Sequence, residues 1–397
     1  MRKENSEKIN IGILIQNIVP YQIARINTLK ESKKFNLTIF CALRKDKFAI
    51  FNETKYFSEF SIIYLQNLSI SELEKYVKIK KIQILVTSGY SFKTSIIALL
   101  LKRKYGNLFV LACCESNSWD FKRNYFLELV KSLIIKNFDG FLTGSESHQQ
   151  YLKKFITKKD KTYFSNGYDV VDNNHFKNHN FKEIKKLNKF TFISLSRLEE
   201  KKNHIRLIEA FNKVIFFCKN HKVKYPQLFI IGEGYLKKIL IQKVNELGLE
   251  SFVHFTGAIE YNFLPLAFQK AHVFIHPSSV EQWGLVVNEA MASSLPVLVS
   301  RQSGCSSYLI NKKINGDTFS AFSTDEIAET MCKYLMKSDK ELTKMGIMGL
   351  QTIEQKYSTR EYYLGLNRII NNLLDEPKQV SFLNGFLLFI LYKFKKI

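Results

Sequence analysis

Two glutamates eight residues apart, Glu281 and Glu289, are the side chains best placed to do chemistry in this sequence. They lie in the stretch HVFIHPSSVEQWGLVVNEAMASSLPVLVSRQSGCSSYLI (272–310), where apolar strand-like runs stand before and after a helix-like run. A strand–helix–strand order predicts a parallel sheet, and ligands of such sheets lie at the carboxyl ends of the strands. Glu281 falls in the loop at that position, and Glu289 falls on the predicted helix.

The residues between the two glutamates suit a phosphate. Backbone amides at a helix start, here near Gly284 and Leu285, have no intrahelical partner and carry partial positive charge. The two carboxylates can accept hydrogen bonds from hydroxyls on either side of that phosphate. A ligand with hydroxyls flanking a diphosphate is a nucleotide sugar. The alternative, two solvated charges on an amphipathic helix, stays open on spacing alone.

Three cations follow the apolar run FTFISLS (190–196), Arg197, Lys201 and Lys202. Breaking a sugar–phosphate bond leaves negative charge on the departing diphosphate, and fixed cations stabilise that charge. Arginine can bind a phosphate through two hydrogen bonds, whereas lysine acts as a point charge. The alternative is an ordinary solvated loop in a lysine-rich protein.

The stretch around Glu281 resembles the retaining glycosyltransferases of family 4, also called group 1. Their mark is Glu-x7-Glu within the frame P-S-x-x-E-x-x-G-x-x-x-x-E-A-M-A, which this chain carries from Pro277 to Ala292. One departure is Ser294, at a position where the family usually has glycine. Since that glycine eases a tight helix exit, we expect a strained turn at Ser294.

The resemblance implies roles for these residues and a fold. Glu281 would accept hydrogen bonds from the donor sugar and Glu289 from the ribose. The segment after residue 196 resembles the family's G-R-L-x-x-x-K pattern, in which Arg197 and Lys202 contact the phosphates. Ile259 lies where the family's loop meets the nucleobase. The implied fold is α/β with GT-B architecture, two Rossmann-like doubly wound domains facing across a cleft, and neither a metal nor a cofactor is expected.

A second resemblance concerns the acceptor. The segment CCESNSWDFKRNYFLELVK resembles a subset of family 4, and its cleft-lining candidates are Glu115, Asp120 and Arg123. Many family members carry a catalytic histidine near that point. Because no histidine precedes His148 here, that role is either unfilled or has moved to Glu115. For Glu128 and Lys131, we favour an ordinary helical ion pair over a binding role.

Composition bounds the class of protein. The 397 residues suffice for two domains, and 46% hydrophobic and 14% aromatic residues argue against disorder. The formal charge of +23 could attract nucleic acid, an anionic membrane or an acidic substrate. Without an arginine-rich tract or zinc-finger spacing, a nucleic-acid partner is not expected. We interpret the charge as compositional drift with a bias toward membrane surfaces.

Cysteines and histidines show no metal-binding spacing. The six cysteines form no CxxC pair and are expected to be small core residues in a reduced, cytoplasmic setting. His254, His272 and His276 alternate with apolar residues in predicted strands, so structural roles are expected for them. The first residues, MRKENSEKIN, lack the basic-then-apolar order of a signal peptide.

The order of apolar runs predicts two alternating α/β domains. We expect an N-terminal acceptor-side domain at 1–170, an interdomain linker at 171–189 and a nucleotide-sugar-binding domain at 190–357. The last segment, 358–397, is predicted to return to the first domain and end in an apolar, basic tail. Strands are expected in the runs NIGILI, NLTIFCA, FSIIYL, IQILVTS, LFVLACC, FDGFLTG, FTFISLS, QLFIIG, FVHFTG, HVFIHP and PVLVS.

The tail from Val380 to Tyr392 is almost continuously apolar and is followed by lysines. It is shorter than the roughly 20 residues needed to cross a bilayer as a helix. It could lie in the membrane interface or pack as a last helix on the first domain, and both alternatives stay open. Membrane binding would place the protein at the inner face of the cell membrane and favour a lipid-linked acceptor.

The leading hypothesis from the sequence is a metal-independent hexosyltransferase. It would move a sugar from a nucleotide donor to a glycan or lipid-linked glycan, as in cell-surface polysaccharide synthesis. A nucleotide-sugar epimerase or a phosphorylase of the same architecture is an alternative from another enzyme class. A basic protein that binds membrane or nucleic acid without catalysis is the non-enzymatic alternative.

Overall fold

A computed structural model describes residues 8–42, 61–119, 124–157, 160–177, 186–373 and 380–394. The chain divides into two compact units. The first comprises Met1–Val170 with Thr359–Ile397, and the second comprises Val171–Ser358.

The first unit is built on a seven-stranded sheet with the order β3-β2-β1-β4-β5-β6-β7, and its described pairings are parallel. Inner strands such as β4 are apolar and buried along their whole length, as expected when helices cover both faces. Its strands are β1 (Ile9–Ile15), β2 (Phe35–Cys41), β3 (Ile62–Tyr64), β4 (Ile84–Thr87), β5 (Phe109–Cys114), β6 (Gly140–Thr143) and β7 (Tyr163–Asn166).

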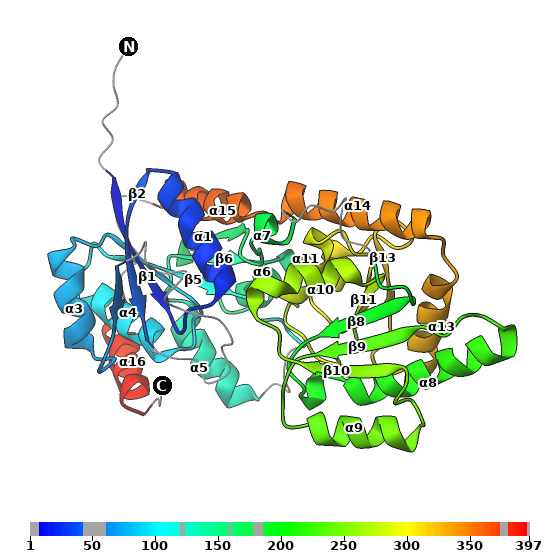
Figure 1. Ribbon diagram of the computed structural model, residues 1–397. Coiled ribbons are helices and arrows are strands. Elements are labelled where there is room, and N and C mark those ends of the chain that lie inside the picture. The colour runs from blue at the N-terminus through cyan, green and yellow to red at the C-terminus, as the bar shows by residue number, and fades with distance from the viewer. Residues whose placement is uncertain are drawn as a thin grey trace, which may run out of the picture. The chain divides into compact units, whose positions relative to one another are not determined.

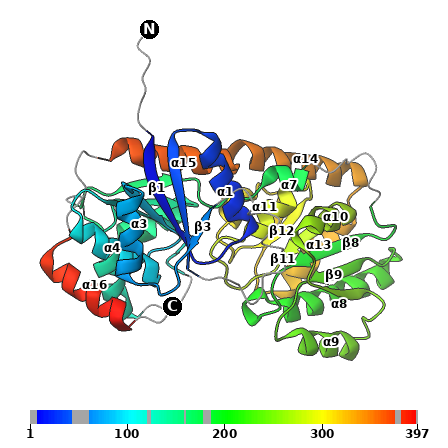
Figure 2. The same ribbon diagram turned by 60° about the vertical axis from the view of Figure 1, so that its left-hand side comes forward.

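Helices cover both faces of this sheet. Figures 1 and 2 show α3, α4 and α16 on one side and α1 and α15 on the other. Helix α1 begins at Pro20, where the missing N–H of proline is harmless, as predicted. The helices are α1 (Pro20–Glu31), α3 (Ile70–Ile79), α4 (Lys93–Lys104), α5 (Tyr125–Ile135), α6 (Glu146–Lys153), α15 (Thr359–Asn372) and α16 (Phe382–Phe394).

The second unit is built on a six-stranded parallel sheet with the order β10-β9-β8-β11-β12-β13. In Figure 1, α8 and α9 lie on one side of this sheet and α10 and α11 on the other. The strands are β8 (Thr191–Leu195), β9 (Gln227–Ile231), β10 (Val253–Gly257), β11 (Val273–His276), β12 (Val297–Ser300) and β13 (Gly316–Phe319). The helices are α7 (Asn173–Lys177), η2 (Glu200–Lys202), α8 (His204–His221), α9 (Lys237–Glu246), η3 (Tyr261–Phe263), α10 (Leu264–Lys270), α11 (Leu285–Ala292), α12 (Ser306–Leu309), α13 (Thr324–Leu335) and α14 (Asp339–Lys356).

The predicted fold class, two Rossmann-like α/β domains, is confirmed, and every predicted strand is present. Two strands escaped prediction, β7 and β13, whose sequences YFSN and GDTF are short and partly polar. Both are edge strands, which need less apolar sequence than the strands between two neighbours.

The segment predicted as an interdomain linker, 171–189, is partly helical. It contains α7, and its residues 178–185 lie outside the described residues. Phe176 is fully buried and its ring packs against those of Tyr261 and Phe268. The start of this segment is therefore an integral part of the second unit.

Helix α16 shows that the tail packs as a last helix on the first unit, which was one of the two alternatives for it. Leu388 is fully buried in the core of the first unit, so one face of α16 packs on the domain. The other face leaves Phe386 and Phe389 exposed. Within the described residues, every helix is too short or too polar to span a bilayer. The cysteines are free thiols and all but Cys332 are buried, as predicted.

Candidate functional site

The loops that carry Lys202 and Glu281 are held together at one end of the second sheet. They follow β8 and β11, which are neighbouring parallel strands. The amide of Ser279 donates to the carbonyl of Lys201 at 2.8 Å, and Asn203 Nδ2 donates to the carbonyl of Pro277 at 3.0 Å. These bonds fix the spacing between the two loops.

Glu281 is the centre of a charged cluster. Lys202 Nζ forms an ion pair with Glu281 Oε2, and His276 Nε2 and Ser278 Oγ lie 3.5 and 3.4 Å from the same oxygen. Burial alone would raise the pKa of Glu281, but His276 and Lys202 together hold that pKa well below its usual value. Burial lowers the pKa of His276. At neutral pH, Glu281 is therefore ionised and His276 is neutral.

The start of helix α11 lies beside this cluster. Gly284 has a φ of 104° and precedes the first helical residue, Leu285, which is half-buried. A Cβ added to Gly284 would lie 3.3 Å from His276 Nε2 and 3.4 Å from Glu281 Cγ. The absence of a side chain thus lets the helix start approach the Glu281 carboxylate closely.

Glu289 occupies a different environment on the same helix. It is half-buried, and its side chain makes no hydrogen bond within the described part of the chain. Burial raises its pKa to about 8. The two glutamates of the pair are therefore in opposite protonation states at neutral pH, Glu281 ionised and Glu289 protonated.

Arg197 is in the same region as Lys202 but is more exposed. Its side chain is 65% exposed and lies 3.4 Å from Glu199 Oε1. The loop that carries it packs on two glycines: a Cβ at Gly232 would lie 2.0 Å from the carbonyl oxygen of Ser196, and one at Gly234 would lie 2.4 Å from that of Leu198. The glycines after β9 therefore position this loop through backbone contact.

The other predicted donor residue, Ile259, follows β10 at the edge of the sheet and is half-buried. The amide of Gly232 donates to the carbonyl of Gly257 at 2.9 Å, which ties the loop after β10 to the loop after β9. The structure thus brings Lys202, Glu281 and Gly284 close together, whereas Ile259 lies in the loop after β10, two strands away from β8 in the sheet.

Two residues of this site were not predicted. His276 was expected to be structural rather than a metal ligand, and its ring contacts Glu281 because the last residue of β11 faces the loop that follows it. Trp283 is almost fully buried, and its Nε1 donates to Asn288 Oδ1 at 2.9 Å, which anchors the loop to α11. A large aromatic residue directly before a helix start was the available signal. The structural role predicted for His272 is confirmed, since its Nδ1 accepts a hydrogen bond from the amide of Thr191.

Glu115 in the first unit follows β5 directly and is half-buried. Of the other predicted acceptor residues, Asp120 and Arg123 lie outside the described residues. The predicted helical ion pair is confirmed, because Lys131 Nζ lies 2.8 Å from Glu128 Oε1.

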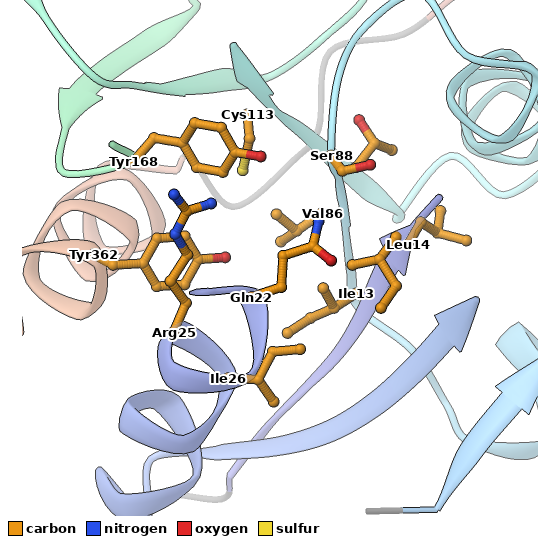
Figure 3. Close-up of a pocket in the computed structure, with 12 residues that line it drawn as sticks. Ile13, Leu14, Gln22, Arg25, Ile26, Val86, Ser88, Cys113, Tyr168 and Tyr362 are labelled. Atoms are coloured by element: carbon orange, nitrogen blue, oxygen red, sulfur yellow. The ribbon is translucent and has the colours of Figure 1, made fainter. Parts of the chain in front are cut away.

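A small cavity at the carboxyl ends of β1 and β4 contains a buried arginine that sequence reasoning missed. Arg25 is 2% exposed, and its Nε and Nη2 donate to the carbonyl of Val170 at 3.3 and 3.1 Å. Figure 3 shows its guanidinium between the rings of Tyr168 and Tyr362, with Gln22 pointing into the same space. The guanidinium carbon lies 4.2 Å from the centroid of the Tyr168 ring, a cation–π distance.

No cluster of three or more His, Cys, Asp or Glu side chains with a metal-binding arrangement occurs among the residues that the structure describes.

The chain is similar in sequence and in fold to known glycosyltransferases. The family model described as glycosyl transferases group 1 matches residues 175–349. The chain is 29% identical to the alpha-monoglucosyldiacylglycerol synthase of Streptococcus pneumoniae over 180 residues, 43% of this chain and 40% of that protein. It is 27% identical to the O-antigen chain mannosyltransferase RfbU of Salmonella typhimurium over 235 residues, 56% of this chain and 64% of that protein. The matched regions thus span less than two thirds of these relatives.

Among solved structures, Anabaena HepE in complex with UDP superimposes with a TM-score of 0.71 at 16% identity, covering 92% of this chain and 100% of HepE. The fold is therefore that of the GT-B glycosyltransferases. Together with the family match, these similarities support a glycosyltransferase.

Proposed function

We propose that the protein is a retaining glycosyltransferase of family 4 that transfers a hexosyl group from a nucleotide sugar. The observation that carries the proposal is the cluster of Lys202, Glu281 and His276 at the start of α11. It combines a cation, the amides of a helix start and an ionised carboxylate, which is the chemistry needed to bind a diphosphate next to sugar hydroxyls. That the related fold of HepE has been solved with UDP and with UDP-glucose supports a nucleotide-sugar donor.

The proposed roles follow from these positions. Lys202 and Arg197 bind the diphosphate together with the amides of Gly284 and Leu285. Because Lys202 is paired with Glu281 in the free protein, an arriving diphosphate would share this lysine with the carboxylate. Glu281 is then left to accept hydrogen bonds from the sugar hydroxyls.

Two further contacts are proposed for the nucleoside. Glu289 accepts hydrogen bonds from the ribose hydroxyls, and Ile259 packs on the nucleobase. Because Glu289 is protonated in the free protein at neutral pH, its carboxyl can also donate one hydrogen bond until it ionises.

In the reaction, the bond between the sugar C1 and the diphosphate oxygen breaks on the face where the bond to the acceptor oxygen forms. The proton of the acceptor hydroxyl passes to the departing diphosphate. Lys202 and Arg197 stabilise the charge that develops on the diphosphate, so protein cations take the place of a metal. On the acceptor side, Glu115 accepts a hydrogen bond from the attacking hydroxyl in the bound complex, before the proton of that hydroxyl passes to the departing diphosphate, and Asp120 and Arg123 bind more distant groups of the acceptor.

The proposed acceptor is a glycan or a lipid-linked glycan used in cell-surface polysaccharide synthesis, at the inner face of the cell membrane. Two relatives have names that fit this proposal: one is an alpha-monoglucosyldiacylglycerol synthase, and the other is an O-antigen chain mannosyltransferase. Helix α16 offers a membrane contact, because Phe386 and Phe389 are 55% and 43% exposed and Lys393 Nζ lies 5.4 Å from the Phe389 ring. An apolar face with a basic rim suits an anionic lipid surface.

The test of the donor site is the variant Lys202→Ala, with Lys201→Ala as its control. Lys201 is the neighbouring lysine, its side chain is 55% exposed, and its Nζ lies 3.8 Å from Glu199 Oε2. We expect UDP or another nucleoside diphosphate to stabilise the wild-type protein against thermal unfolding. Loss of a charged hydrogen bond should weaken that binding about 10- to 100-fold in Lys202→Ala and leave it unchanged in Lys201→Ala.

The test of catalysis is Glu281→Gln with donor and acceptor both present. We expect turnover to fall by about 100-fold while the thermal unfolding temperature stays within a few degrees. Conversion of the donor sugar without any acceptor would instead favour an epimerase. Equal nucleotide binding by the Lys202 and Lys201 variants would contradict the proposed donor site.

A further inference from the structure

The strand order of the first sheet reverses between β1 and β4. The chain runs from β1 to β2 and β3 on one side of β1, and it then places β4 on the other side. In open parallel sheets, ligands bind beyond the carboxyl ends of the strands at such a reversal. The cavity of Figure 3 lies there, because residues at the ends of β1 and β4 line it. The place of this cavity in the fold is therefore that of a ligand site.

Three polar atoms of this cavity have no hydrogen-bond partner within the described part of the chain. They are Gln22 Oε1, Arg25 Nη1 and Ser88 Oγ, and all three atoms are buried. Thr87, by contrast, is satisfied by the protein itself, since its hydroxyl donates to the carbonyl of Gly89 at 2.7 Å. A buried polar atom without a partner costs stability, so native proteins seldom leave several together. Three such atoms around one cavity point to a ligand group that completes their hydrogen bonds.

Arg25 is held firmly at the cavity. Its Nε and Nη2 donate to the carbonyl of Val170, and its guanidinium carbon lies 4.7 Å from the centroid of the Tyr21 ring and 4.2 Å from that of the Tyr168 ring. Gln22 lies three residues earlier on α1, and side chains at that spacing project from the same face of a helix. Figure 3 shows both side chains directed into the same space. Their positions are thus set by the protein itself, before a ligand binds.

The size of the cavity limits what it can hold. Its volume is about 20 Å³, which is room for one group of the size of a water molecule. The rest of the wall is largely apolar and cannot complete the hydrogen bonds of the three polar atoms; it includes Ile13, Leu14, Ile26 and Val86. A phosphate or a whole sugar ring is too large, whereas a single hydroxyl group of a larger ligand fits.

The kinds of hydrogen bond on offer select the chemistry of that group. Arg25 can only donate, the oxygen of the Gln22 amide can only accept, and the hydroxyl of Ser88 can do either. An anion would leave the Gln22 oxygen facing negative charge, and it would share the guanidinium with the carboxyl groups of Glu115 and Asp169, which interact with it electrostatically. An ammonium group would be repelled by Arg25. A hydroxyl group accepts and donates at once and therefore matches the set.

We propose that this cavity binds one hydroxyl group of the acceptor sugar, with Arg25 Nη1 donating to the hydroxyl oxygen and Gln22 Oε1 accepting a hydrogen bond from it. Ser88, the most exposed of the three residues, makes the third hydrogen bond. The inference rests on the proposed function and deepens its acceptor side, since Cys113 of β5 lines the cavity and Glu115 follows β5 directly. The acceptor is then a glycan whose sugar offers a second hydroxyl besides the one that reacts. A lipid alcohol with a single hydroxyl cannot fill the cavity and react at the same time.

The first experiment locates the hydroxyl group without any need for activity. Crystals of the wild-type protein are soaked with the methyl α-glycosides of glucose, galactose and mannose. We expect one sugar hydroxyl within hydrogen-bond distance of Arg25 Nη1 and Gln22 Oε1. In crystals without sugar, a water molecule should take the same position, because water offers the same donors and acceptors. Water in that position in the presence of every glycoside, or a chloride ion there, would overturn the proposal.

The second experiment measures the KM for the glycoside acceptor at saturating donor. Gln22→Leu keeps the size of the side chain but removes its hydrogen bond, so this KM should rise about 10-fold while the KM for the donor stays unchanged. Ser88→Ala should raise the acceptor KM about threefold, and the control Ser91→Ala, at an exposed position, should leave it unchanged. With an acceptor analogue that has hydrogen in place of the bound hydroxyl, wild type and Gln22→Leu should have the same KM.

Failure of this inference can be told apart from failure of the proposed function. A wild-type acceptor KM in both Gln22→Leu and Ser88→Ala, in an enzyme that transfers sugar, would refute the hydroxyl site and leave the function standing. Equal rises in the KM for donor and acceptor would also refute the site, since they would show a general structural effect. A sugar hydroxyl in the cavity of a protein without transferase activity would refute the function while the site stands. If Gln22→Leu does not fold, Ser88→Ala and the crystal structures decide.

Discussion

Glu289→Gln provides a quantitative test of the site because its effect depends on pH. The ordinary pKa of this carboxyl is 4.5, and burial raises it to about 8. Between these two values the folded protein holds a proton that the unfolded chain has released. The free energy of unfolding therefore falls as pH rises from about 4.5 to about 8 and is flat above that interval. Glutamine has no proton to lose, so the variant lacks this fall.

The magnitude follows from the same two values. Each pH unit is worth about 1.4 kcal/mol, so at pH 7 the loss of stability is about 3 kcal/mol. Solvent screening of the half-buried carboxyl reduces it to about 1–2 kcal/mol. For a unit of this size, Glu289→Gln should raise the unfolding temperature by about 2–8 °C at alkaline pH and by almost nothing near pH 5.

The assay uses tryptophan fluorescence during thermal unfolding. The chain has two tryptophans, and Trp283 is buried beside α11 in the unit that carries Glu289. In a Trp119→Phe background, the signal therefore reports the second unit alone. Glu250→Gln, at an exposed position of the same unit, is the control and should follow the wild-type pH curve. Parallel curves for wild type and Glu289→Gln from about pH 5 to about pH 8.5 would refute the argument.

Two other substitutions test single features. Ser294 has a φ of 57°, in the left-handed region, so Ser294→Gly should raise the free energy of unfolding by about 1 kcal/mol. The control is Ser293→Gly, at a φ of −84°, which should lower the free energy of unfolding. Urea unfolding measures both effects. Replacing Phe386 and Phe389 together by serine should reduce sedimentation with anionic vesicles several-fold. The control, Phe216→Ser at another exposed phenylalanine, should sediment like wild type. Equal sedimentation of all three proteins would exclude α16 as the membrane contact.

Ser294, where the chain departs from the family pattern, shows that a sequence pattern can predict a local backbone conformation. The resemblance predicted a strained turn at that position, and the left-handed φ confirms it. The prediction succeeded because the helix exit is local: the conformation of one residue is set by the chain on either side of it. The alternation of strands and helices was predictable for the same reason, since each element shows its own period of apolar residues.

The missed residues depended on contacts across the fold. Arg25 stands among isoleucines on the buried face of α1, and nothing nearby in the sequence shows that the carbonyl of Val170 will accept its hydrogen bonds. The interpretation of His276 as structural was incomplete for a related reason, because its partner lies in the loop that follows its strand. The edge strands β7 and β13 escaped because their stability comes from a neighbouring strand rather than from their own composition.

The sequence by itself determined the fold class and indicated the residue types of the proposed donor site, because hydrophobic periods and the spacing of Glu281 and Glu289 are properties of the chain read in order. Only the tertiary structure decided the protonation states and the ion pairs of those residues. It paired Lys202 with Glu281, and it buried Glu289 so that its pKa is raised to about 8. Protonation depends on burial and on charges brought near by strand register, and neither quantity exists until the chain has folded.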